Sequence, residues 1–90
     1  MTDMDTVNRR LEPFIAGLRV KLGTTKNVSK GDWRDMSPKE LLRRLQEEID
    51  ELHEAIHFDG DVLGECYDVA AFAFMLADVF SRQDHLEVSR

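Results

Sequence analysis

The sequence predicts an all-α chain with three main helices, forming a helical bundle completed by oligomerisation. Three separate stretches carry apolar residues at helical spacing, and only two prolines and five glycines interrupt the chain of 90 residues. Helix stop and start signals separate the stretches. We expect a single domain over residues 1–90, near the lower size limit for a self-sufficient hydrophobic core.

The first helix is expected over residues 1–23, because its apolar side chains recur at the i, i+4 and i+7 spacing of an amphipathic helix. Pro13 should kink this helix or mark its true start, and Gly23 is a plausible stop. A polar loop without periodicity follows over residues 24–36. The apolar positions are Met4, Val7, Leu11, Phe14, Ile15, Leu18 and Leu22.

Two further helices are expected within residues 37–80. Ser37-Pro38-Lys39-Glu40 starts the first of them, with serine as the cap, proline in the first turn and Glu40 completing a capping box. It should run to about His57. Asp59-Gly60-Asp61 then breaks the chain, and Asp61 can cap a last helix that ends near Phe80. The polar tail, residues 81–90, is expected to fray.

Composition excludes several classes of protein. The net charge of −6 argues against nucleic acid as a partner. The apolar run Val69–Ala77 is shorter than the roughly 20 residues of a membrane span, and Met1–Asn8 is too polar for a secretory signal. Cys66, the only cysteine, excludes a disulfide framework within one chain. These features predict a cytoplasmic protein.

Acidic side chains are concentrated in one part of the chain. Residues 47–68 hold nine of the eighteen Asp and Glu residues and no Lys or Arg. Like charges at helical spacing repel, so a divalent cation is a natural counter-charge. On a helical wheel Glu48 and Glu51 flank the apolar stripe, which consists of Leu41, Leu42, Leu45, Ile49, Leu52 and Ile56. A solvated acidic face is the alternative interpretation.

The last helix contributes a second acidic pair. Glu65 and Asp68 lie at i and i+3, on the same flank as Phe72 and Met75. A buried ionised carboxylate must be protonated or find a cation. If the two helices pack antiparallel, Glu48, Glu51, Glu65 and Asp68 converge into an all-oxygen set suited to Mg²⁺ or Mn²⁺.

The motif pair Glu47-Glu48-Ile49-Asp50-Glu51 and Glu65-Cys66-Tyr67-Asp68 resembles that of the all-α NTP pyrophosphohydrolase superfamily, which includes the MazG-like proteins and dimeric dUTPase relatives. The resemblance covers about residues 26–80. It implies Mg²⁺-dependent hydrolysis of a nucleoside triphosphate to the monophosphate and pyrophosphate. By position, Glu48, Glu51, Glu65 and Asp68 match the metal ligands. Glu47 matches the leading glutamate, which either supports the metal ligands from outside or orients water. The resemblance thus gives Glu47 and Glu48 as the candidate catalytic residues.

The loop before the motifs resembles that of short, phage-type members, in Lys21-Leu22, Asn27 and Lys30-Gly31-Asp32-Trp33. Candidate phosphate contacts are Lys26, Lys30 and Arg34, with Asn27 also assigned to substrate binding, and Trp33 can stack on a base. The alternative is that Trp33 belongs to the core or an interface and that the lysines are merely solvated. Family members assemble as dimers or tetramers, which predicts a homodimer or homotetramer here.

Three other interpretations compete with this one. Glu54-x-x-His57 has the spacing of di-iron bundles, but both side chains point away from the apolar stripe and are better explained as surface residues. A helical dimerisation module would have only a solvated acidic face. A family member that has lost activity would keep nucleotide binding and a vestigial site.

Overall fold

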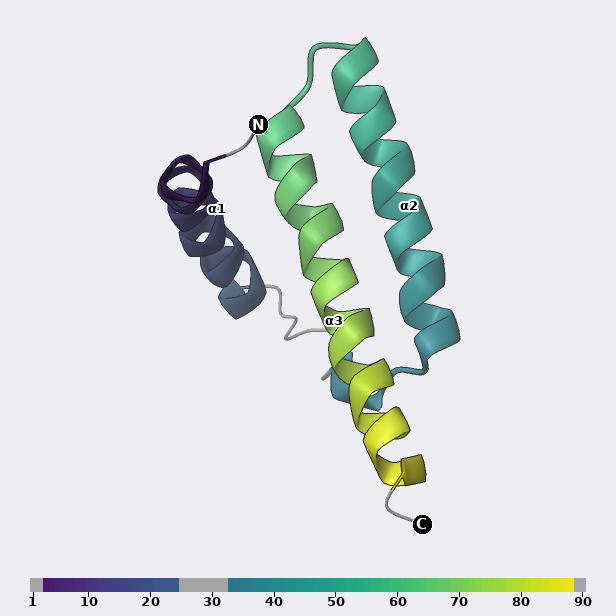
Figure 1. Ribbon diagram of the computed structural model, residues 1–90. Helices are drawn as coiled ribbons and strands as arrows, with labels where there is room; N and C mark the ends of the chain where they lie inside the picture. The colour runs from purple at the N-terminus through teal and green to yellow at the C-terminus, as the bar shows by residue number, and fades with distance from the viewer. Residues whose placement is uncertain (1–2, 25–32, 89–90) are drawn as a thin grey trace.

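The computed structural model describes residues 3–24 and 33–88. This part of the chain forms the helices α1 (Met4–Thr24), α2 (Pro38–His57) and α3 (Val62–Val88), and one 3₁₀ turn, η2 (Trp33–Asp35). α2 and α3 form an antiparallel hairpin, and α1 lies along the other side of α3 (Figure 1). The all-α prediction is confirmed.

The ends of the hairpin follow the predicted capping signals. The Ser37 hydroxyl accepts from the Glu40 backbone N–H, and the Glu40 carboxylate accepts from the Ser37 N–H at 3.1 Å. The turn between α2 and α3 is closed by a hydrogen bond from the Gly60 N–H to the Ala55 carbonyl, and Asp59 takes a left-handed φ of 63°. Asp61 then accepts from the Gly64 N–H at 3.0 Å, as an N-cap should.

α1 begins at Met4, so Pro13 lies inside the helix and does not mark its start. The Asp3 carboxylate caps the first turn by accepting from the Asp5 backbone N–H at 3.3 Å, and it also accepts from the Thr6 hydroxyl at 2.9 Å. Against α3, the ring of Phe14 stacks on Tyr67 with centroids 4.9 Å apart. Gly17 faces the same tyrosine, where even a Cβ would collide with the ring.

α3 is longer than the sequence indicated. It continues to Val88 instead of ending near Phe80. No glycine or proline follows Phe80 to stop the helix. Asp78 also supports this turn, since its carboxylate pairs with Arg82 at 3.0 Å in the favourable i, i+4 arrangement.

The hydrophobic core is small and lies between α2 and α3. The fully buried cluster consists of Leu41, Ala71, Met75 and Val79, and half-buried side chains from α1 and η2 pack against it. The described molecule measures 45 × 33 × 22 Å, with a radius of gyration of 15.1 Å. A compact domain of this length would have a radius of about 12 Å. The three helices lie side by side, with α3 in the middle, and this arrangement leaves large parts of the helix surfaces exposed to solvent.

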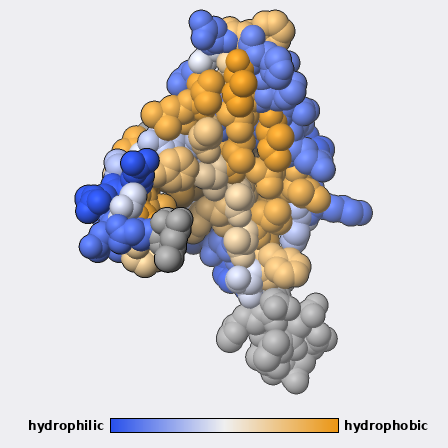
Figure 2. Space-filling view, turned by 45° about the horizontal axis from the view of Figure 1, so that its top comes forward, coloured by the Kyte–Doolittle hydropathy of each residue, from blue (hydrophilic) through white to orange (hydrophobic). Residues whose placement is uncertain are grey.

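The apolar stripe predicted on α2 is only partly buried. Leu41, Glu48 and Ala55 form the buried line of α2. Leu42, Ile49 and Ile56, expected at the core, are 45%, 47% and 60% exposed. The stripe is wider than the contact with α3, so its outer edge remains in solvent. Figure 2 shows apolar side chains gathered in a broad band down the middle of the molecule.

The run Val69–Ala77 is apolar all round, yet only part of it is buried. Ala71 and Met75 are buried, whereas Phe74 is 45% exposed. No helix among the described residues combines the length and apolar character required to cross a bilayer.

Candidate metal centre

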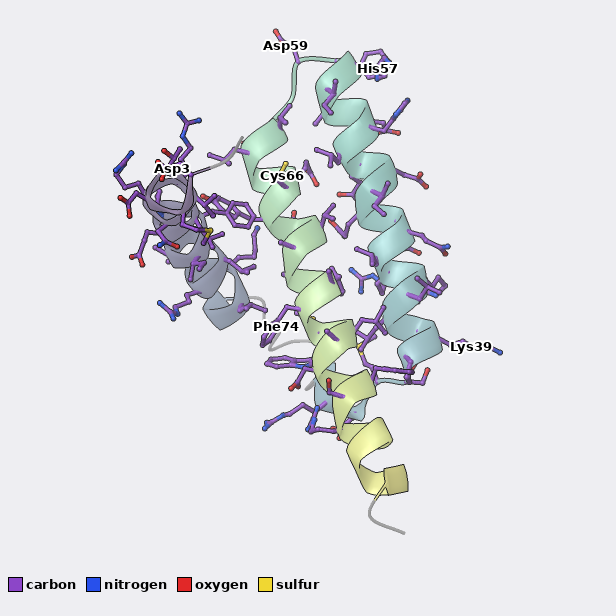
Figure 3. The ribbon with its side chains drawn as sticks, viewed as in Figure 1. Asp3, Lys39, His57, Asp59, Cys66 and Phe74 are labelled. Atoms are coloured by element: carbon purple, nitrogen blue, oxygen red, sulfur yellow. The ribbon has the colours of Figure 1, made fainter. Side chains whose placement is uncertain are left out.

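Three acidic side chains from two helices meet between α2 and α3. One carboxylate oxygen each from Glu48, Glu65 and Asp68 lies within 4.8 Å of the others. Glu65 and Asp68 share a face of α3 because they are three residues apart, and α2 presents Glu48 from its buried line. Figure 3 shows side-chain oxygens of the two helices pointing toward one another at the level of Cys66.

Glu48 is the buried charged residue of the described chain, with 7% of its surface exposed. Burial, followed by the charges of Glu51, Asp68 and Glu65, raises the pKa of Glu48 to about 7. The cause is physical, since desolvation and neighbouring negative charges both disfavour the ionised form. A cation at this position would remove both penalties.

Within the described part of the chain, Glu65 contributes an unpartnered oxygen to the group. Its Oε1 atom is buried and has no hydrogen-bond partner among the described residues. Desolvation first, and then the charge of Asp68, raises the pKa of the Glu65 carboxyl. Buried polar atoms in proteins are nearly always paired, so this oxygen could accept a ligand.

Two basic residues that the sequence did not assign to the site approach it. The Lys21 ammonium, from the last turn of α1, lies 2.8 Å from Oδ1 of Asp68. Arg44 lies 3.8 Å from Glu48, beyond hydrogen-bond distance, with its guanidinium 4.8 Å from the ring of Phe72. The i, i+4 spacing to Glu48 could have indicated Arg44. Lys21 carries no such local signal toward Asp68.

The remaining predicted acids lie further out. Glu51 is exposed and is not one of the three converging oxygens, although its charge contributes to the raised pKa values of Glu48 and Glu65. It lines an open groove of about 530 Å³ that also reaches Glu65 and Asp61. Glu47 is paired with Arg43 and Arg44 on the surface of α2.

The predicted substrate contacts are only partly described. Lys26, Asn27 and Lys30 lie outside the described residues. Trp33 packs against the core, and Arg34 is exposed beside it, 5.8 Å from the indole ring. Trp33 contacts α3 about three turns beyond Asp68, or about 15 Å along the helix axis. Its assignment to base stacking stays a prediction.

The donor set fits a hard divalent cation. It contains oxygen only, it is dominated by negative charge, and one of its buried oxygens has no partner within the described chain. Mg²⁺ and Mn²⁺ prefer such carboxylate ligands. Glu54 and His57 are exposed, as expected for surface residues, and this does not support the di-iron interpretation.

Comparison of the chain with protein-family models, with curated proteins and with solved structures finds no match.

Proposed function

We propose that the protein is a Mg²⁺-dependent nucleoside triphosphate pyrophosphohydrolase. The observation that carries the proposal is the convergence of one carboxylate oxygen each from Glu48, Glu65 and Asp68 within 4.8 Å. In addition, Oε1 of Glu65 is buried and has no hydrogen-bond partner within the described residues. The order and spacing of the two acidic motifs resemble those of the all-α NTP pyrophosphohydrolases. This resemblance is the basis for proposing this reaction.

In this proposal Glu48, Glu65 and Asp68 hold the ion, and Glu51 joins them from the rim of the groove. Mn²⁺ is an alternative ion. When bound, the ion neutralises phosphate charge and acidifies the attacking water. Glu47 orients that water, with its own carboxylate held by Arg43 and Arg44.

The groove lined by Glu51 and Glu65 gives the polyphosphate access to the site. Water attacks a phosphorus atom of the α–β anhydride, the bridging P–O bond breaks, and the products are the monophosphate and pyrophosphate. A carboxylate that is not held by the ion accepts the proton of the water. Basic residues of the preceding segment, Lys26, Lys30 and Arg34, would offset the charge of the substrate, with Asn27 and Trp33 completing its contacts.

We also propose that the active form is a homodimer or homotetramer. The exposed positions Leu42, Ile49 and Ile56 follow one another at seven-residue intervals along α2. Half-buried Leu45 and Leu52 lie between them, giving the spacing of a coiled-coil seam. A second copy would cover this seam.

The decisive experiment is a pyrophosphate-release screen over canonical, deoxy and damaged nucleoside triphosphates, with Mg²⁺ and with Mn²⁺. Glu65→Gln and Asp68→Asn should each abolish turnover while the protein stays folded. Asp50→Asn, on the solvent side of α2, is the matched control and should retain activity. Pyrophosphate release at the wild-type rate by both site variants would show that the assignment is wrong.

The exposed seam also favours a second candidate, a helical dimerisation module without catalysis. The two candidates differ in their response to metal. A ligand bound only by the folded state raises its melting temperature, so the enzyme requires a Mg²⁺-dependent increase. The module predicts no shift, and it predicts that Glu48→Ala leaves stability unchanged or raises it.

A further inference from the structure

The Lys21–Asp68 ion pair places a positive charge against the carboxylate group. The ammonium lies 2.8 Å from Oδ1 of Asp68, and both side chains are about one third exposed or less. The pKa of Lys21 is raised, first by its hydrogen bond with Asp68, which outweighs the opposing effect of burial, and then by the charges of Asp68, Glu65 and Glu48. The ammonium therefore interacts with every member of the three-carboxylate group.

A divalent ion in the same group would compete with this ammonium. Both cations require an oxygen of Asp68, and two positive charges a few ångströms apart repel strongly in a partly buried setting. Without a divalent ion, the three carboxylates repel one another. There the ammonium offsets part of the repulsion among carboxylates that sit within 4.8 Å of one another.

We propose that Lys21 is the internal counter-cation of the metal-free site and that it exchanges with the divalent ion at Asp68. This inference rests on the proposed metal site. Lys21 lies in the last turn of α1 and Asp68 in α3, so the pair also fastens α1 to α3. Binding of the divalent ion breaks this ion pair between α1 and α3. The Lys21 ammonium then turns toward solvent, where an anionic ligand can reach it.

Direct metal titration of the substrate-free protein tests the exchange. Lys21→Met should bind Mg²⁺ about tenfold more tightly than the wild type, because the competing charge is gone. Its metal-free melting temperature should fall, so the increase produced by saturating Mg²⁺ should be larger. Arg19→Met removes the same charge from an exposed position of the same helix and should match the wild type in both measurements.

The outcomes separate this inference from the proposed function. Wild type and both variants binding Mg²⁺ with equal affinity would overturn the exchange and leave the metal site standing. Weaker binding by Lys21→Met would show that Lys21 supports the metal, which also overturns it. Absence of Mg²⁺ binding by the wild type would overturn both proposals.

Chemical labelling of the wild type provides a test that does not depend on a variant. An amine-reactive reagent, read out by peptide mass spectrometry, should modify Lys21 severalfold faster when Mg²⁺ is added, because its ion pair is broken. The exposed Lys39, at the start of α2, is the internal reference and should not change. An unchanged ratio of Lys21 to Lys39 labelling at saturating Mg²⁺ would contradict the exchange.

Discussion

The indole Nε1 of Trp33 donates to Oδ2 of Asp78 at 3.3 Å, joining residues that are 45 positions apart. The ring also meets Phe74 edge-on, with centroids 6.4 Å apart. These contacts hold the short turn η2 on α3. Because η2 leads directly into the cap of α2, they fix the position from which α2 begins to pack.

Substitution of this tryptophan separates its structural role from substrate binding. We expect Trp33→Phe to lower the free energy of unfolding by about 1–2 kcal/mol, through loss of a hydrogen bond to a charged group and of buried ring area. Urea denaturation measures the loss. The double variant with Asp78→Asn should be less destabilised than the sum of the two single changes. Unchanged stability with a raised KM would instead favour base stacking.

The raised pKa of Glu48 makes the stability of the metal-free protein depend on pH. Its pKa is raised to about 7 in the folded state by burial and by its acidic neighbours, from about 4.3 in an unfolded chain. The folded state therefore binds the proton more tightly. This contribution to stability is fully present below about pH 4.3 and is lost as the pH rises through about 7.

We therefore expect the melting temperature, measured with a chelator present, to fall between pH 5 and pH 8. Glu48→Gln removes the titrating group and should flatten this part of the profile. The pKa of Glu65 is raised in the same direction. The melting temperature of this variant should therefore still fall slightly between pH 5 and pH 8. A wild-type melting temperature that rises between pH 5 and pH 8 would contradict the assignment of Glu48 as the buried acid.

Local signals in the sequence determined the hairpin and much of the site. The Ser37–Glu40 capping box and the Asp61 cap depend on neighbours within a few residues, so they could be identified from the order of residues alone. The spacing of Glu65 and Asp68 likewise required only helical geometry. Glu48, placed at the edge of the apolar stripe, is indeed buried.

Features that depend on distant packing were not predictable in this way. The approach of Lys21 to Asp68 depends on how α1 lies on α3, for which no sequence pattern was available. The wheel could not show that α3 would cover the line through Leu41 and leave Ile49 exposed. It also placed Glu51, together with Glu48, at the edge of the core, whereas Glu51 is exposed.

The fit of α1 against α3 depends on the absence of a side chain at Gly17. A Cβ there would collide with the ring of Tyr67, which is itself stacked on Phe14. We expect Gly17→Ala to destabilise the protein by about 1–3 kcal/mol through overpacking. This reverses the usual benefit of alanine within a helix.

Gly23 provides the matched control, because, beyond its own stretch of helix, no atom of the described residues lies within 4 Å of the position that its Cβ would occupy. Gly23→Ala should stabilise α1 by up to about 1 kcal/mol. Thermal unfolding of the two variants measures the difference. If Gly17→Ala were as stable as Gly23→Ala, the close packing of α1 on Tyr67 would be wrong.

The exposed seam on α2 predicts how the chain associates. Ile49 lies at its middle, 47% exposed, between Leu42 and Ile56. Ile49→Glu would bury a carboxylate in any interface formed there, at a cost of about 3 kcal/mol or more, and so weaken association by at least about 100-fold. Light scattering should find the wild type as a dimer or tetramer at micromolar concentration and the variant as a monomer.

Gln46→Glu is the control for the added charge. It occupies an exposed polar position of the same helix that does not belong to the seam, so its oligomeric state should equal that of the wild type. A stable wild-type monomer at micromolar concentration would count against oligomerisation altogether. An Ile49→Glu variant that still assembles would place the interface on another face, where the exposed Phe74 and Phe80 of α3 offer an alternative apolar surface.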